Sequence, residues 1–365
     1  MGINFNSLTA EERATLALSS LYNSYAYTRF KMSKFEEYDL YVKNKDFLVS
    51  DRMITFTDLS GSLLALKPDV TLSIIKNTRD TGGVRKVYYN ESVYRALKGE
   101  NSFREITQTG LECIGKLDFY NICEVITLAA KSLECISDEF VLDISHLGFV
   151  SGLINYAGLS AIRGEVLSLL GEKNVSAINA LCEKNGIDIK YTEALKKLAT
   201  TGGSIDDVVA SLMPLCEDEE MVSALSDLVK IGNVLKVCSL YNKTRLDFSV
   251  VNDMRYYNGI VFQGFIKGIP SGVLSGGQYD LLVNKMGKNA CAIGFAVYLD
   301  ELERLSSLRG PFDVDVLLIY NDAAPEDKIA KLSAEITENG ETVLVRKSDD
   351  GTVKYKRLLV AEEQI

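Results

Sequence analysis

The stretch from Lys86 to Gly115, KVYYNESVYRALKGENSFREITQTGLECIG, decides the fold of this chain. Its first part is rich in residues that favour strands and continues to Arg95, and Gly99 to Ser102 then have loop chemistry. From Phe103 to Ile114, successive side chains alternate between two faces, as they do along a strand. The stretch therefore predicts a β-hairpin.

One face of the second predicted strand is unusually polar. It carries Arg104, Gln108 and Glu112 at even spacing, and Arg95 lies just before the loop. A strand that covers a core places apolar residues on its inner face, so this face either contacts a polar ligand or is solvated. From the pattern alone, the solvated face of an antiparallel sheet is the simpler interpretation.

The composition is typical of a globular protein that folds without disulfides or metal. The chain has 365 residues, of which 47% are hydrophobic and 25% charged, so two or three domains with a full core are expected. No apolar run approaches the roughly 18 residues that a membrane span needs. The first residues also lack the basic and then apolar pattern of a signal peptide. We therefore expect a cytoplasmic protein that does not associate with membranes.

The cysteines, the histidine and the net charge exclude several kinds of site. The seven cysteines are scattered, and His146 is the single histidine, which argues against a zinc site or a disulfide framework. No nucleophile motif accompanies His146, so it is interpreted as structural. The formal net charge of -10 disfavours a protein that holds tRNA through its phosphates. We expect no metal and no cofactor.

The remaining pattern predicts four parts. Residues 1–150 and 246–308 combine strands and helices, residues 151–245 are helical throughout, and residues 309–365 form a short α/β region. Near the start, Thr9 and Glu12 form a capping box for a helix. Pro68 ends a strand, and Asp69 and Thr71 then begin a helix, where their ordinary role is to cap its free N–H groups.

The hairpin resembles motif 2 of class II aminoacyl-tRNA synthetases, in the form found in histidyl-tRNA synthetases. The family pattern Arg-Glu-Phe-x-Gln-x-Gly-x-Glu is matched by residues 104–112, REITQTGLE. Other segments resemble further family motifs in the correct order: Leu66 to Thr71, Tyr256 to Gly259, Gly276 to Asp280, and Ala292 to Leu305. The resemblance implies an α+β fold, a class II synthetase-like antiparallel sheet flanked by helices, with a helical insertion and a C-terminal region like a truncated anticodon-binding domain.

The departures from the family fall on the residues that handle ATP. Leu97 stands where the family has an acid that holds adenine, Asn252 replaces the arginine of the histidine-specific motif, and Glu301 replaces the arginine of motif 3. Charge that develops on a transferred phosphoryl group needs preorganised cations. These replacements argue against adenylate formation, unless Arg104 or Arg304 supplies the positive charge in place of the missing arginines.

The amino-acid side of the resembled pocket is retained. In the resembled enzymes, the positions of Asp69 and Thr71 face the amino group of the bound amino acid. A carboxylate such as Glu112, together with tyrosine hydroxyls, can hold both imidazole nitrogens. The resemblance therefore implies a histidine-like ligand held by Asp69, Thr71, Arg95, Gln108, Glu112, Tyr257 and Tyr279. The alternative, that these side chains bond only to one another and bind nothing, stays open.

A known family combines these features: the regulatory subunits of ATP phosphoribosyltransferase, which resemble histidyl-tRNA synthetases that have lost aminoacylation. This resemblance implies a non-catalytic chain with a homodimer core that joins a short-form catalytic subunit in a hetero-octamer. The complex would perform the first step of histidine biosynthesis under feedback by L-histidine, and the chain would hold no tRNA. The alternative is a divergent histidyl-tRNA synthetase or another adenylating class II enzyme.

Overall fold

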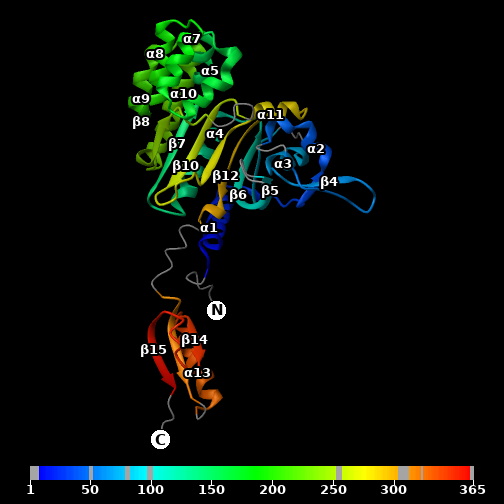
Figure 1. The fold of residues 1–365 in the computed structure, drawn as a ribbon, viewed down its shortest axis with the longest axis vertical. Helices are drawn as coiled ribbons and strands as arrows, with labels where there is room; N and C mark the ends of the chain where they lie inside the picture. The colour runs from blue at the N-terminus through cyan, green and yellow to red at the C-terminus, as the bar shows by residue number, and fades with distance from the viewer. Residues whose placement is uncertain are drawn as a thin grey trace. The chain divides into compact units, whose positions relative to one another are not determined.

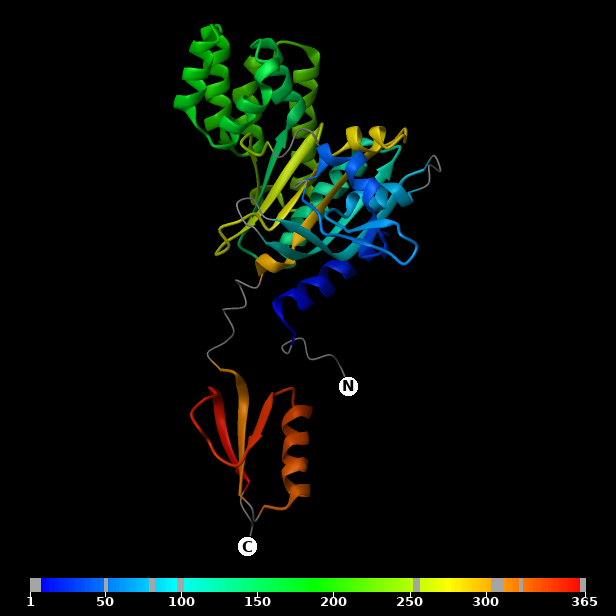
Figure 2. The same ribbon diagram turned by 45° about the vertical axis from the view of Figure 1, so that its right-hand side comes forward.

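The computed structural model describes residues 8–48, 52–78, 83–96, 102–251, 257–302, 312–321 and 324–361 (Figures 1 and 2). The chain separates into two compact units. One consists of Ala14–Leu302, and the other contains Glu303–Ile365 with Met1–Arg13. The finer division of the larger unit into three parts stays an interpretation of the sequence.

A nine-stranded sheet forms the centre of the larger unit. Its strands, in spatial order, are β1 (Thr28–Arg29), β5 (Arg85–Ala96), β6 (Phe103–Gly115), β12 (Cys291–Tyr298), β11 (Leu274–Gln278), β10 (Ile260–Ile266), β7 (Phe140–His146), β9 (Thr244–Asp247) and β8 (Gly202–Gly203). Neighbours run antiparallel, except that β1 with β5 and β7 with β9 are parallel. The predicted hairpin is β5 and β6, so the expected antiparallel sheet is confirmed.

The polar face of β6 continues onto both neighbouring strands. Glu112 is opposite Val87 on β5 and Gly294 on β12. Gln108 and Glu112 are only 3% and 2% exposed, so the interpretation of this face as solvated is wrong for both residues. Side chains from distant segments cover them, and a pattern read along one strand does not contain that information. Arg104, near the open end of the hairpin, is exposed.

Two helices pack on the opposite face of the sheet. They are α1 (Ala10–Ser24) and α4 (Phe119–Glu134). The Tyr22 hydroxyl on α1 lies 3.0 Å from the Ser132 hydroxyl on α4, and the Tyr22 ring packs against Tyr88 of β5 with centroids 5.9 Å apart. The predicted capping box of α1 is present, because Thr9 and Glu12 exchange backbone-to-side-chain hydrogen bonds of 2.8 and 3.1 Å.

A small subdomain covers the hairpin on its polar side. It consists of β2 (Phe35–Glu37), α2 (Tyr38–Lys43), η2 (Lys45–Phe47), β3 (Thr55–Thr57), β4 (Leu63–Leu66) and α3 (Thr71–Asn77), with the strands in the order β2-β4-β3. Ala65, Leu72 and Ile75 are buried in one cluster with Tyr89 of β5 and Ile114 of β6. This packing places the first residues of α3 over the hairpin.

The long helical region follows β7. It contains α5 (Leu147–Tyr156), η3 (Ser160–Ile162), α6 (Arg163–Gly171), α7 (Val175–Lys184), α8 (Ile189–Thr200), α9 (Ile205–Leu212), η4 (Met213–Leu215), α10 (Glu219–Val237) and η5 (Tyr241–Lys243). His146 Nδ1 accepts a hydrogen bond from the Gly148 amide at 3.1 Å, so the single histidine caps α5. The β8–β9 pairing and a 2.7 Å Lys173–Asp247 ion pair join this region to the edge of the sheet.

The smaller unit contains a three-stranded parallel sheet. Its elements are β13 (Val314–Tyr320), α13 (Glu326–Glu338), β14 (Val343–Arg346) and β15 (Tyr355–Ala361), and the strand order is β14-β13-β15. Residues 347–354 connect β14 to β15 without a helix. Among the residues that the structure describes, no helix is long and apolar enough to cross a membrane.

Candidate functional site

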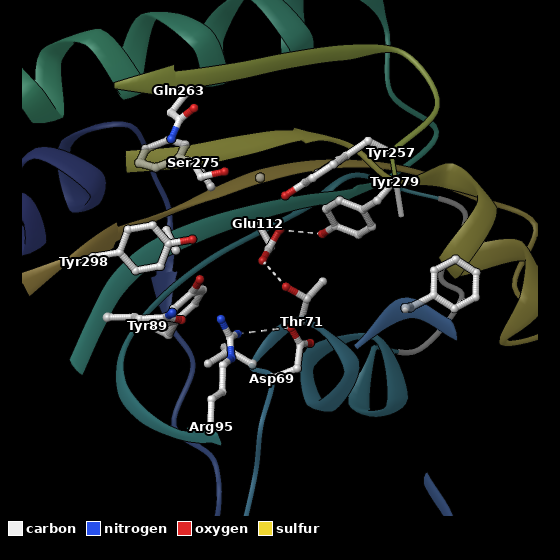
Figure 3. A pocket seen from close by; sticks show the side chains of 16 residues that line it. Asp69, Thr71, Tyr89, Arg95, Glu112, Tyr257, Gln263, Ser275, Tyr279 and Tyr298 are labelled. Atoms are coloured by element: carbon white, nitrogen blue, oxygen red, sulfur yellow. Dashed lines mark hydrogen bonds and ion pairs between the residues drawn. The ribbon is translucent and has the colours of Figure 1, made fainter. Parts of the chain in front are cut away.

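A cavity of about 360 Å³ lies over the polar face of the hairpin (Figure 3). All seven residues that the sequence analysis selected line it: Asp69, Thr71, Arg95, Gln108, Glu112, Tyr257 and Tyr279. They come from the start of α3, from β5 and β6, and from the segments that flank β10 and α11 (Asp280–Lys285). The fold therefore brings together residues that lie in five separate segments of the sequence.

Small residues form part of the cavity floor. Gly294 lines the cavity, and a Cβ atom on it would lie 1.7 Å from Glu112 Oε2. Gly110 of β6 is not a lining residue, but a Cβ atom on it would lie 2.5 Å from the hydroxyl of the lining residue Tyr89. Glycine at both positions lets polar side chains approach the sheet closely. Glycine therefore makes room on the sheet for the Glu112 carboxyl group and the Tyr89 hydroxyl.

Glu112 stands at the centre of the site. The Thr71 hydroxyl donates to its Oε1 at 2.8 Å, and the Tyr279 hydroxyl donates to its Oε2 at 2.5 Å. Burial raises the pKa of Glu112 to about 8, although the two hydroxyl hydrogen bonds oppose this effect. At neutral pH, Glu112 of the ligand-free site therefore carries a proton.

Asp69 and Arg95 form a second charged group at the other side of Thr71. Asp69 Oδ1 accepts from the Leu72 amide at 2.8 Å, which is a capping bond of α3, and its Oδ2 lies 3.8 Å from Arg95 Nη2. Burial raises the pKa of Asp69, and the Arg95 guanidinium partly offsets this. The capping interpretation of Asp69 is confirmed, whereas Thr71 bonds through its side chain to Glu112.

Four tyrosines line the walls. Figure 3 shows Tyr257 and Tyr279 on one side of the cavity and Tyr89 and Tyr298 on the other. Burial is the largest cause that raises the pKa of Tyr257 well above 10. The Tyr257 hydroxyl is therefore neutral at physiological pH and can donate or accept a hydrogen bond.

Four further polar residues line the walls and were not predicted from the sequence: Tyr89, Gln263, Ser275 and Tyr298. The alternation of side chains along β5 could have identified one of them. Tyr89 and Arg95 are an even number of positions apart, so both side chains lie on the same face of the strand. Gln263 of β10 and Ser275 of β11 are cross-strand partners, and this pairing depends on a register that one strand does not encode. Tyr298 is paired with Gln108 across β12 and β6.

Two residues considered above for ATP chemistry, Glu301 and Arg104, are not among the described residues that line the cavity. The Ser271 hydroxyl donates to Glu301, which belongs to η6 (Leu299–Leu302). Four other residues named above lie outside the described residues: Leu97, Asn252, Tyr256 and Arg304.

The charges of the cavity limit its chemistry. Arg95 is the one cationic side chain among the described lining residues, and two acids, Asp69 and Glu112, accompany it. The described part of the chain holds no cluster of His, Cys, Asp and Glu that could bind a metal. Such a site suits a small ligand with hydrogen-bonding or cationic groups better than a polyphosphate.

Comparison with known proteins identifies the relatives of this chain. A family model for histidyl-tRNA synthetases matches residues 6–302. An ATP phosphoribosyltransferase regulatory subunit from Clostridium kluyveri is 30% identical over 319 residues, 83% of this chain and 81% of that protein. The crystal structure of an ATP phosphoribosyltransferase regulatory subunit/histidyl-tRNA synthetase from Bacillus halodurans has a TM-score of 0.77 at 23% identity and covers 96% of this chain and 94% of its own.

A further solved structure is that of an ATP phosphoribosyl transferase complex from Thermotoga maritima. One of its chains has a TM-score of 0.63 at 18% identity, and the match covers 80% of this chain and 98% of that one. At these identities the two structural likenesses show the fold alone. Together with the family model, they confirm the class II synthetase-like fold that the sequence predicted.

Proposed function

Because the chain belongs to the family of ATP phosphoribosyltransferase regulatory subunits, which carries a histidyl-tRNA synthetase domain, we propose that it regulates a short-form catalytic ATP phosphoribosyltransferase. That enzyme performs the first step of histidine biosynthesis. The names of the relatives and the existence of a solved Thermotoga maritima complex support a separate catalytic partner. The chain itself would carry no aminoacylation activity.

L-Histidine is the ligand that the cavity fits best, and the convergence of all seven selected residues carries this proposal. The protonated Glu112 can donate a hydrogen bond from its carboxyl group to a nitrogen of a neutral imidazole, so that the pair shares one proton. Asp69 and Thr71 lie close enough to Glu112 to receive the ammonium group. Arg95, the cation of the cavity, is suited to the carboxylate.

Adenylate chemistry has little support in the same geometry. The triphosphate of ATP and its transition state need several cations, and among the described lining residues Arg95 alone is cationic. Asp69 already lies 3.8 Å from that guanidinium. A negatively charged nucleotide would therefore meet a single cation that Asp69 already partly neutralises.

We further propose that two copies of the chain pair and that the pair forms the core of a hetero-octamer. The small sheet of the subdomain leaves Phe35 45%, Phe56 39% and Leu63 46% exposed. The Phe35 and Phe56 rings pack edge to face with centroids 5.4 Å apart. An exposed aromatic cluster of this kind supports a protein contact. The net charge of -10 supports the absence of tRNA among the partners.

Calorimetric titration of the purified chain tests the ligand. We expect L-histidine to bind and ATP–magnesium to give no binding heat. Binding of ATP–magnesium would overturn the non-catalytic assignment and favour a divergent adenylating enzyme. Absence of L-histidine binding would move the regulatory site away from this cavity.

A reconstitution assay tests the regulatory role independently. The short-form catalytic subunit from the same organism is assayed alone, with this chain, and with its Glu112→Gln variant. We expect the chain to raise the activity and L-histidine to inhibit the mixture. The variant should still activate but should lose most of the inhibition. A mixture no more active than the catalytic subunit alone would contradict the proposed role.

A further inference from the structure

Gln278, the last residue of β11, is not among the described residues that line the cavity. Its Oε1 accepts a hydrogen bond from the Ile260 amide at 2.8 Å. The backbone of Gln278 also accepts from the Asn258 amide at 3.0 Å. Gln278 therefore bonds twice to the segment that immediately follows Tyr257.

A second set of bonds joins the same two segments. The Asp280 amide donates to Asn258 Oδ1 at 2.8 Å, and Asn258 Nδ2 donates to Asp280 Oδ2 at 3.2 Å. Asp280 Oδ1 accepts from the Ala292 amide of β12 at 2.7 Å. We call Asn258, Gln278 and Asp280 the clasp.

The clasp residues flank both tyrosines on one wall of the cavity. Tyr257 immediately precedes Asn258, and Tyr279 lies between Gln278 and Asp280. The packing is close, because a Cβ atom on Gly259 would lie 2.1 Å from Gln278 Oε1. The hydroxyl of Tyr279 is thereby held 2.5 Å from Glu112. Among the described cavity-lining residues, none belongs to the clasp.

We propose that the clasp residues are positioning residues: they fix Tyr257 and Tyr279 against Glu112 and so set ligand affinity without touching the ligand. The ligand part rests on the proposed function. The geometric part does not, because the hydrogen bond from Tyr279 to Glu112 exists without a ligand. A purely structural role would instead affect folding and leave the cavity chemistry unchanged.

The test compares Gln278→Met, which removes the acceptor of the Ile260 amide, with Gln278→Glu, which keeps a side-chain acceptor. Asp315→Asn is the control in the other compact unit, where Asp315 Oδ2 accepts from both the amide and the hydroxyl of Thr342 at 2.9 Å. All variants are measured as full chains at a temperature at which each is folded. The first readout is the Kd for L-histidine by calorimetry.

We expect Gln278→Met to weaken L-histidine binding roughly tenfold, a typical consequence of misplacing one buried hydrogen-bond group. Gln278→Glu should restore most of the affinity, and Asp315→Asn should not change it. If Gln278→Met lowers the Tm but leaves the Kd at the wild-type value, Gln278 is only structural and the proposal is overturned.

A second readout needs no ligand and separates this proposal from the proposed function. The titration midpoint of Glu112 is followed by NMR on chains labelled at the glutamate carboxyl carbon, and Glu112→Gln identifies its signal. The Tyr279 hydrogen bond lowers the pKa of Glu112, so Gln278→Met should move the midpoint upward and Gln278→Glu should return it. If the wild type binds no L-histidine while the midpoint moves, the ligand assignment fails and the positioning role stands. An unmoved midpoint overturns the positioning role.

Discussion

Tyr279 donates its hydroxyl to Glu112 Oε2 at 2.5 Å, although the two residues are 167 positions apart in the chain. Thr71 occupies the other carboxyl oxygen at 2.8 Å. Glu112 is therefore held from both sides by hydroxyls, at a depth where burial raises its pKa to about 8. A carboxyl group in this state keeps its proton at neutral pH and can donate a hydrogen bond to a neutral imidazole nitrogen.

The affinity for L-histidine should depend on pH with a maximum between about 6.5 and 8. The complex shares one proton between Glu112 and the imidazole, whose free pKa is about 6.5. Below that value both groups are protonated and one proton must leave. Above about 8, the pKa of Glu112, neither is protonated and one must be taken up. Calorimetric titrations from pH 5 to 9 should therefore give a Kd that is lowest within this window and rises on both sides of it.

The alkaline side of that profile has a specific control. Glu112→Gln cannot supply the proton, so its affinity should be weaker throughout and should show no loss between pH 7 and 9. An alkaline limb that persists unchanged in this variant would show that another group causes it.

Glu112 should also lower the stability of the fold as the pH rises. Its pKa is raised from 4.5 to about 8 in the folded state, so the folded chain binds more protons than the unfolded chain between those values. Stability is then full below pH 4.5 and falls as the pH passes through 8. Relative to Glu112→Gln, the wild type should lose up to about 4 kcal/mol in free energy of unfolding between pH 5 and 9. Urea denaturation at several pH values checks this, and parallel curves for both proteins would contradict it.

Removal of the Tyr279 hydroxyl should affect the site more than the fold. Tyr279→Phe deletes a donor to Glu112, which we expect to weaken L-histidine binding by roughly fivefold or more. Tyr22→Phe is the matched control, because its buried hydroxyl lies 3.0 Å from Ser132 on the opposite side of the sheet. Both variants should lose about 1 kcal/mol of stability, but only Tyr279→Phe should change the Kd. Equal effects on the Kd would contradict a direct role for Tyr279.

The elements that the sequence predicted correctly are those with strong local signals. The hairpin has two strand-forming runs and a polar loop, and α3 begins after Pro68 at Thr71, as expected. The burial of Gln108 and Glu112 had no such signal. Side chains from other segments, such as Thr71 and Tyr279, bury these two residues. The alternation along one strand therefore predicted a solvated face, whereas the structure places hydroxyl groups there.

The site residues were predicted from the resemblance to known families. The same origin explains which lining residues were not predicted. Motif matching selected residues at the positions that the family conserves for its ligand, and these do line one cavity. It did not select Ser275 or Gln263, which become neighbours only through the β10–β11 register. The hydrogen bond from the Ile260 amide to the Gln278 side chain likewise depends on the pairing of two segments that are separate in the sequence.

The close approach of Glu112 to the floor predicts that Gly294→Ala is poorly tolerated. The added Cβ would lie 1.7 Å from Glu112 Oε2 and 2.5 Å from the Leu111 carbonyl oxygen. The Leu111 carbonyl on one side and the hydrogen-bonded Glu112 carboxyl on the other leave little room for the added methyl group. We therefore expect the free energy of unfolding to fall by roughly 2–4 kcal/mol and L-histidine binding to be lost. Gly164→Ala is the control, since open space surrounds that position in α6. It should be neutral or slightly stabilising, and equal Tm values for both variants would contradict the packing argument.

His146 predicts a loss of stability in the acid range. Burial lowers its pKa from 6.5 to about 4, so between these values the unfolded chain binds a proton that the folded chain does not. Stability is then lost as the pH falls from 6.5 towards 4. His146→Asn keeps an acceptor for the Gly148 amide, which caps α5, but cannot be protonated.

The variant should therefore gain up to about 2 kcal/mol over the wild type at pH 5, measured against their difference at pH 7.5. The partial exposure of the ring makes this an upper bound. Because the chain has one histidine, its imidazole NMR signals report the titration without overlap. A midpoint near 6.5 would show that the ring is not buried enough to lower its pKa and would contradict this prediction.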